Sequence, residues 1–340
     1  MISFVNDYCE GAHPEILKKL TEINFDKQAG YMDSVYCKSA AEKIRAALSC
    51  PEAEVFFLTG GTQTNLIAID TLLKPYEGVV AAETGHVETH EAGAIEFTGH
   101  KVLTVPSHDG KMDAGELSAF IKKYYGDESW EHIVTPGMVY ISQPTELGTL
   151  YTKEELKALR KVCEEYHMPL YMDGARLAEA LAAYETLTLP DYAALTDAFY
   201  IGGTKCGALF GEALCFTKGN MPERFLSRVK QHGALLAKGW MAAVQYDVLF
   251  TDGLYEKGGK NAVEKAAVIK KALKEKGYEF YVDSPTNQIF VTMSRERAMK
   301  LAEEVSYTMW EDHGDGRVTV RFVTSWATTK EDVGKLTEVL

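Results

Sequence analysis

Three features are scarce or missing in this sequence, and each absence argues against a class of protein. No apolar run approaches a membrane-spanning length, and no basic region followed by an apolar core opens the chain. Positive charge is in deficit: 36 Lys and Arg against 49 Asp and Glu give a net charge of -13, which argues against nucleic acid or an anionic membrane as partner. The six cysteines have no CxxC spacing, so neither a zinc site nor a disulfide framework is indicated. We therefore expect a cytoplasmic protein with no metal site.

The order of strand-like and helix-like segments predicts the fold class. Apolar runs of strand length, such as Val55–Leu58, Val139–Ser142 and Ala198–Ile201, alternate with helical patterns through most of the chain. This alternation is typical of an α/β protein with a mostly parallel sheet between helices. Because 340 residues are too many for one compact core, we expect two domains. We place a large domain with an N-terminal arm at residues 1–250 and a smaller C-terminal α+β domain at residues 251–340.

Shorter patterns predict three local features. Residues 2–14 are expected to form a polar arm outside the main sheet. Residues 28–39, which include Tyr36, show little periodicity and are expected to form a functional or interface loop before the next helix. The basic stretch from Met221 predicts one long helical region that reaches about Phe250.

Two apolar runs each end close to a charged residue. Met168–Met172 leads into Asp173, and Ala198–Ile201 leads into the glycine-flanked Lys205, 32 residues after the aspartate. Ligands of open α/β sheets bind at the carboxyl ends of the strands. A lysine and a carboxylate there suit pyridoxal phosphate, since the amine forms a Schiff base and the carboxylate keeps the pyridinium nitrogen protonated. Alone, Asp173 has a plainer explanation as a helix cap and Lys205 as a solvated loop residue, but together they favour the cofactor.

A glycine turn after a strand suits the phosphate of such a cofactor. Gly60 and Gly61 follow the run Val55–Leu58 and precede a helical segment, where free backbone N–H groups bind phosphate. Thr62 and Gln63 add side-chain donors. The turn lacks the lysine of a Walker motif, so the pattern is weak by itself.

His86 and Arg321 are two further candidates. His86 follows a strand and is placed to stack on a ring or to act in acid–base chemistry. His90 does not complete a zinc-protease motif with it, because the glutamate between them stands in the wrong position. Arg321 lies in the apolar strand pattern RVTVRFV and either faces solvent or grips a carboxylate in a cleft between the domains.

Five motifs together carry a family resemblance. GGTQTN, HVETHEAG, DGARL, GGTKCG and RFVTSW, in this order and at these distances, resemble the threonine aldolase and β-eliminating lyase family of pyridoxal phosphate enzymes, which have the aspartate aminotransferase-like fold, fold type I. The resemblance covers nearly the whole chain, and DGAR followed by the glycine-flanked lysine is its most specific part. It implies a retro-aldol cleavage of threonine or allo-threonine to glycine and acetaldehyde, in a homodimer or homotetramer with sites at the subunit interfaces.

The resemblance also implies a role for each matching residue. Three residues are expected to be catalytic: Lys205 forms the Schiff base, Asp173 pairs with the pyridine nitrogen, and His86 stacks on the cofactor ring. Further cofactor contacts are expected from Gly61, Thr62, Gln63, Arg176, Thr204 and Lys238. Substrate contacts are expected from Asn6, Arg176 and Arg321, and from Tyr36 in a neighbour's site.

Two departures from the family pattern leave part of the chemistry open. Many threonine aldolases carry a second histidine after the strand that here reads ISQPTE, and Thr145 stands at the matching position. A phosphate-binding arginine is missing from the basic helix, where Lys238 is the nearest cation. The β-hydroxyl proton then goes to His86, to a phosphate-held water, or to a residue of the neighbouring subunit. A β-eliminating lyase, an aminotransferase acting on another amino acid, and a non-catalytic cofactor-binding protein remain alternatives.

Overall fold

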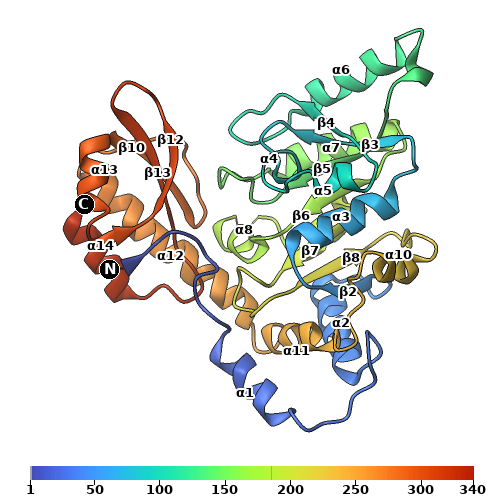
Figure 1. Cartoon of the computed structure of the whole chain (residues 1–340), viewed down its shortest axis with the longest axis horizontal. Helices are drawn as coiled ribbons and strands as arrows, with labels where there is room; N and C mark the ends of the chain where they lie inside the picture. The colour runs from blue at the N-terminus through green and yellow to red at the C-terminus, as the bar shows by residue number, and fades with distance from the viewer. Residues whose placement is uncertain (1, 185) are drawn as a thin grey trace.

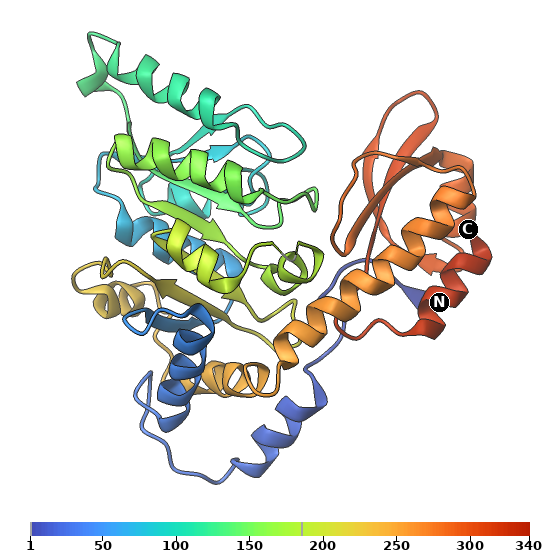
Figure 2. The same ribbon diagram turned by 180° about the vertical axis from the view of Figure 1, so that it is seen from behind.

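The structure, a computed structural model, describes residues 2–184 and 186–340. The described residues form a larger part built on a seven-stranded sheet and a smaller part built on a four-stranded sheet. Helix α12 (Leu254–Glu275) runs from the larger part to the smaller one (Figure 1). The same two parts are seen from behind in Figure 2, where the C-terminus and the first described residues of the chain lie in the smaller part. The chain therefore starts in the smaller part and crosses to the larger one.

The larger sheet has one antiparallel strand among parallel ones. Its strands lie in the order β2 (Glu54–Leu58), β8 (Glu212–Phe216), β7 (Ala198–Gly202), β6 (Leu170–Asp173), β5 (Thr135–Ser142), β3 (Glu77–Ala82) and β4 (Val102–Val105). β8 runs antiparallel to β2 and β7, and the other neighbours pair in parallel. The predicted α/β class with a mostly parallel sheet is confirmed. Since β6 and β7 are neighbours, Asp173 and Lys205 emerge at the same edge of the sheet.

Helices cover both faces of this sheet because alternate strand residues enter two separate cores. On β5, Ile141 belongs to one core and Tyr140 to the other. The first core is covered by α1 (Pro14–Glu22), α2 (Val35–Leu48), α6 (Ala114–Tyr125), α7 (Lys153–Glu165), α8 (Leu177–Ala183), α9 (Leu189–Leu195) and α11 (Trp240–Leu249). The second is covered by α3 (Gly61–Leu72), α4 (His86–Thr89), α5 (Ala94–Phe97) and α10 (Phe225–Gln231), and a short 3-10 turn spans Trp130–His132. No helix of the described residues is long and apolar enough to cross a membrane.

The smaller part has its own core and includes the start of the chain. Its sheet has the order β12 (Thr308–Asp312), β13 (Arg317–Val323), β10 (Gln288–Ser294) and β9 (Glu279–Phe280), packed with α12, α13 (Arg295–Leu301) and α14 (Lys330–Val339). The arm begins as β1 (Ile2–Ser3), which pairs with β11 (Val305–Ser306), and Phe4 is buried in this core. The first arm residues thus lie outside the main sheet and pack with the smaller part. The domain boundary at residue 250 stays a prediction.

Two local predictions are wrong. Residues 35–39 are not a loop, because α2 already begins at Val35 and Ser34 caps it by accepting the Cys37 N–H at 3.1 Å. The basic region is not one helix, since α10 ends at Gln231 and α11 begins only at Trp240. Gly233, two residues after the end of α10, has a φ of +71°, a left-handed conformation that is common where helices end.

Candidate active site

A cavity of about 320 Å³ lies at the carboxyl ends of β5, β6 and β7. Seven of the residues predicted from the sequence line it: Gly61, Thr62, His86, Asp173, Arg176, Thr204 and Lys205. Within the described part of the chain, Asn6, Tyr36, Gln63, Lys238 and Arg321 are not among its lining residues. The fold therefore gathers most of the predicted site at one edge of the sheet.

Asp173 lies in the cavity wall as a carboxylate held by four donors. Its Oδ1 accepts from Tyr200 Oη at 2.5 Å and Ala175 N at 2.9 Å, and its Oδ2 accepts from Tyr140 Oη and Asn65 Nδ2, both at 2.9 Å. Burial would raise the pKa of Asp173, but the charge of His86 and these hydrogen bonds outweigh it and hold that pKa below its ordinary value. Asp173 is not the cap of the next helix, because the N-cap of α8 is Arg176.

His86 is tied to Asp173 through a short polar chain. Asn65 Nδ2 donates both to Asp173 and to Glu91 Oε1, at 2.7 Å from the latter, and Glu91 Oε1 lies 2.7 Å from His86 Nδ1. Burial lowers the pKa of His86, but Glu91 and Asp173 more than compensate, so the pKa lies above its ordinary value. The imidazole is therefore held in one orientation and favours its charged form.

Lys205 projects from the loop after β7 and is half-buried. Among the described residues its amine has no hydrogen bond or ion pair, although its Nζ lies 5.9 Å from the centre of the Tyr8 ring. Burial, and then the nearby charge of Arg176, lower the pKa of Lys205. Lys205 therefore reaches its uncharged, nucleophilic form at a lower pH than an ordinary lysine does.

The glycine turn before α3 packs against the tyrosine that binds Asp173. A Cβ at Gly61 would lie 3.1 Å from the Tyr200 hydroxyl oxygen, closer than an ordinary contact. Gln63 turns back into the turn, where its Oε1 accepts from Thr59 N at 3.2 Å and Thr59 Oγ1 at 2.7 Å. From this turn, Thr59, Gly60, Gly61 and Thr62 line the cavity, whereas the side chain of Gln63 is occupied by Thr59.

The loop after β7 rests on a buried glutamate that the sequence did not single out. Glu212 Oε2 accepts from Gly203 N at 3.1 Å, and Oε1 accepts from Thr204 Oγ1 at 2.8 Å. Burial raises the pKa of Glu212 to about 8. The Thr204 hydroxyl is thus already committed to Glu212 within this chain.

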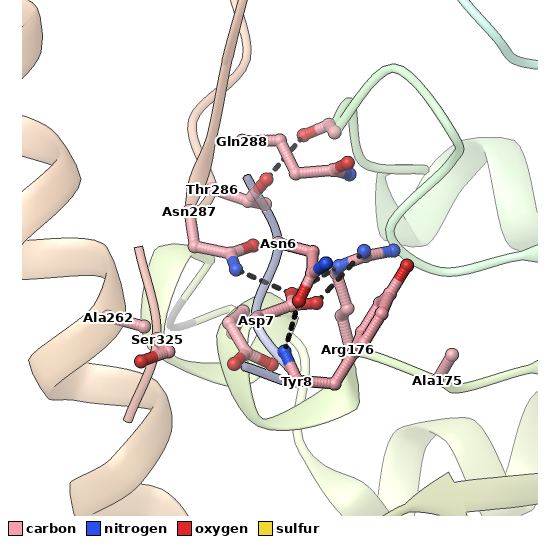
Figure 3. Close-up of polar contacts among 12 residues, drawn as sticks. Asn6, Asp7, Tyr8, Ala175, Arg176, Ala262, Thr286, Asn287, Gln288 and Ser325 are labelled. Atoms are coloured by element: carbon pink, nitrogen blue, oxygen red, sulfur yellow. Dashed lines mark hydrogen bonds and ion pairs between the residues drawn. The ribbon is translucent and has the colours of Figure 1, made fainter. Parts of the chain in front are cut away.

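Arg176 lines the cavity, but its guanidinium is already paired. Arg176 Nε donates to Asp7 Oδ2 at 2.6 Å and Nη2 to Oδ1 at 3.1 Å, while Asn287 Nδ2 donates to the same Asp7 Oδ2 at 2.9 Å. Figure 3 shows Asp7 of the arm between Arg176 of the larger part and Asn287 of the smaller part. The neighbouring Asn6 accepts the Tyr8 N–H through its Oδ1 at 3.0 Å. Asp7 therefore occupies the place on the Arg176 guanidinium where the sequence predicts a substrate carboxylate.

Arg321 presents donors that have no acceptor. Its Nη1 donates to Gln288 Oε1 at 3.2 Å, and its guanidinium carbon lies 5.3 Å from the centre of the Trp310 ring. Among the described residues, the buried Arg321 Nε and Gln288 Nε2 lack any hydrogen-bond partner, and no carboxylate pairs with Arg321. Two neighbouring buried donors without acceptors lower the stability of the fold unless a bound ligand supplies the acceptors.

Tyr36 and Lys238 lie away from the cavity of their own chain. Tyr36 donates to Asp26 Oδ2 at 3.3 Å and stacks on Trp240 with ring centres 6.2 Å apart. Lys238 is exposed in the loop between α10 and α11.

The loop after β5 brings Glu146 to the cavity in addition to Thr145. The Thr145 hydroxyl bonds the Thr149 hydroxyl at 2.7 Å, and the next residue, Glu146, adds a carboxyl group to the cavity wall. Glu146 Oε1 accepts from His86 N at 2.9 Å and Ser142 Oγ at 2.6 Å. The sequence did not predict Glu146, because an irregular loop has no hydrophobic periodicity that would indicate which side chain faces the cavity.

Three comparisons place the chain among known proteins. The model of the family described as Beta-eliminating lyase matches residues 4–321. A low specificity L-threonine aldolase from Pseudomonas sp. (strain NCIMB 10558) is 32% identical over 98% of this chain and 95% of its own length. The structure of a Leishmania major threonine aldolase is 42% identical, with a TM-score of 0.96 over 100% of this chain and 98% of the other. An aspartate aminotransferase from Thermus thermophilus, 17% identical with a TM-score of 0.72 over 100% of this chain and 90% of its own, shares the fold.

Proposed function

This chain belongs to the β-eliminating lyase family, and on that premise we propose that it is a pyridoxal phosphate-dependent lyase that cleaves threonine or allo-threonine into glycine and acetaldehyde. The observation that carries the proposal is the meeting of Lys205, Asp173 and His86 around one cavity at the carboxyl edge of the sheet. The similarity to two threonine aldolases, each over nearly the full length of both chains, supports the choice of substrate.

The residues of the cavity fit the cofactor at each of its ends. The backbone N–H groups at the start of α3, at Gly61 and Thr62, suit the phosphate. Asp173 suits the pyridine nitrogen because its pKa is lowered and it stays ionised. Lys205 suits covalent attachment, and His86 suits stacking on the ring. Pyridoxal phosphate, when bound, supplies a conjugated ring that accepts the electron pair released at Cα of an amino acid.

Two arginines have different tasks in this proposal. Arg321 Nε and Gln288 Nε2 are donors without an acceptor among the described residues. The two oxygens of a substrate carboxylate would supply acceptors for both donors. Arg176 is paired with Asp7 and shapes the wall of the cavity, while its charge lowers the pKa of the neighbouring Lys205. A carboxylate held on Arg321 fixes the amino acid, and this orientation decides which bond to Cα breaks.

The proposal is tested by mixing the purified protein, loaded with pyridoxal phosphate, with L-threonine and L-allo-threonine. We expect absorbance above about 400 nm from the bound cofactor and equal amounts of glycine and acetaldehyde. Serine in place of threonine, with pyruvate as the product to look for, tests β-elimination. Threonine with a 2-oxo acid tests amino transfer. Formation of pyruvate or a new amino acid without acetaldehyde would replace the aldolase proposal with one of these activities, and absence of visible absorbance would remove the cofactor from the account.

We also propose a homodimer or homotetramer in the cytoplasm. A second cavity, lined in part by Tyr31, Phe56, Leu226 and Leu235, presents apolar surface of the kind that subunits bury. Tyr36 and Lys238 do not reach the cavity of their own chain, which suits residues that serve a neighbour's site. Free cysteines, five of them buried, suit a reducing compartment. Sedimentation of an active monomer at working concentration would contradict the oligomer.

A further inference from the structure

Three carboxyl groups line the cavity, and two of them are fully engaged. Asp173 accepts four hydrogen bonds, and each oxygen of Glu212 accepts one. Glu146 differs, because His86 N and Ser142 Oγ both donate to Oε1. The backbone N–H of Glu146 also reaches its own carboxyl group, but no side chain of the described residues donates a hydrogen bond to Oε2. Glu146 therefore lines the cavity with an oxygen that no side chain of the described residues occupies.

The loop that carries Glu146 is held on both sides. Thr145 N donates to Thr149 O at 2.9 Å, and Gly148 N donates back to Thr145 O at 2.8 Å. From the smaller part, Ser284 Oγ and Thr286 Oγ1 donate to Gly148 O at 3.2 and 3.1 Å. Glu146 thus lies on a turn that is fixed by hydrogen bonds, not on a free surface loop. A catalytic group needs such a fixed position, because it must lie close to the reacting atom.

The other basic groups of the cavity are poorly suited to take a proton from a substrate hydroxyl. His86 is already hydrogen-bonded to Glu91 through Nδ1, and the proposed function places its ring flat against the cofactor, where it is poorly aimed at a β-hydroxyl. Lys205 is the group that attaches the cofactor. Burial raises the pKa of Glu146, although the hydrogen bond from Ser142 opposes the shift, and a raised carboxyl pKa approaches that of an efficient base at neutral pH.

We propose that Glu146 is the base that accepts the β-hydroxyl proton of threonine, an inference that rests on the proposed function. The O–H bond breaks and its proton moves to Oε2 of Glu146. The electron pair of that bond forms the carbonyl double bond of acetaldehyde, as the Cα–Cβ bond breaks and leaves its pair on the Cα side. Addition of one proton at Cα completes glycine, so that atoms and charge balance.

Glu146→Gln tests this assignment with little change of shape. The amide oxygen still accepts from His86 N and Ser142 Oγ, but the side chain no longer takes up a proton. The matched control is Glu83→Gln, an exposed carboxyl group just after β3 at the same edge of the sheet and outside the cavity. Both variants and the wild type are compared for cofactor absorbance, for glycine affinity by absorbance titration, for exchange of the glycine α-hydrogen with deuterium, and for threonine cleavage.

We expect Glu146→Gln to bind cofactor and glycine like the wild type and to exchange the glycine hydrogen within about threefold, because neither process involves a β-hydroxyl. Threonine cleavage should fall by about 10²- to 10⁴-fold, the range of general-base catalysis, while Glu83→Gln stays unchanged. Cleavage within about threefold of the wild type, or an equal loss of exchange and cleavage, would overturn the role of Glu146. A wild type that exchanges glycine but does not cleave threonine would instead overturn the proposed function, and this inference with it.

Discussion

Asp7→Asn removes the charge that neutralises Arg176 while keeping the size of the side chain. Asp7 is fully buried and binds Arg176 through two hydrogen bonds, of 2.6 and 3.1 Å. Breaking a buried ion pair by removing one partner costs about 3–5 kcal/mol, because the other charge stays buried without compensation. Asparagine still accepts one hydrogen bond, so we expect a loss of about 3 kcal/mol in the free energy of unfolding.

The assay is urea denaturation followed by tryptophan fluorescence, at fixed protein concentration and saturating cofactor. The matched control is Asp33→Asn, which breaks an exposed pair with Lys38 at 2.9 Å and should cost no more than about 1 kcal/mol. If Asp7→Asn is no more destabilising than Asp33→Asn, Asp7 does not hold the arm, and the assignment of Arg176 as an already neutralised group fails.

The same variant should show a defined dependence on pH. Burial would raise the pKa of Asp7, but Arg176 holds it below its ordinary value in the folded chain. A depressed pKa contributes stability that is complete above the ordinary aspartate value of about 3.9 and is lost as the pH falls through the folded-state value. The difference in unfolding free energy between wild type and Asp7→Asn should therefore narrow below about pH 4.

Three further substitutions test the roles assigned around the cavity. Asp173→Asn should retain cofactor but lose about 10²-fold or more in turnover, because an amide cannot hold the ring nitrogen protonated; full activity would make Asp173 a structural residue. Arg321→Ala should weaken the binding of threonine or glycine by about 2–4 kcal/mol, measured as a higher KM with little change in cofactor absorbance. An unchanged KM would mean that another residue binds the substrate carboxylate. His86→Phe should keep the ring stacked and lose about 10²-fold or less in cleavage, and a near-complete loss with an intact cofactor spectrum would make His86 the base in place of Glu146.

The sequence was most informative where regular elements carry the site. Asp173 and Lys205 follow clear strand patterns, and neighbouring parallel strands bring their carboxyl ends together, so their meeting followed from the alternation of strands and helices. Tyr140 and Tyr200 offered a readable but unused signal, since a tyrosine in a buried strand needs a partner for its hydroxyl, and here both bind Asp173.

Residues on irregular segments escaped prediction for a physical reason. Asp7 lies on an arm without periodicity, and only its contacts with Arg176 and Asn287 reveal that it is buried. In the turn after β5, Thr145 and Glu146 both line the cavity, but the Thr145 hydroxyl bonds within the turn, an arrangement set by hydrogen bonds of the turn and not by a repeat. Residue types alone therefore indicated the chemistry of the site but not which arginine or loop residue serves it.

The most direct test of the central claim is to find the lysine that carries the cofactor. The protein loaded with pyridoxal phosphate is treated with sodium borohydride, which fixes the lysine-linked cofactor to the chain, and is then digested and analysed by mass spectrometry. Lys205→Ala and the exposed Lys238→Ala are treated in the same way. We predict modification at Lys205 in the wild type and in Lys238→Ala, and no modified peptide and no threonine cleavage in Lys205→Ala. Cofactor fixed to another lysine of the wild type, or cleavage retained by Lys205→Ala, would contradict the account.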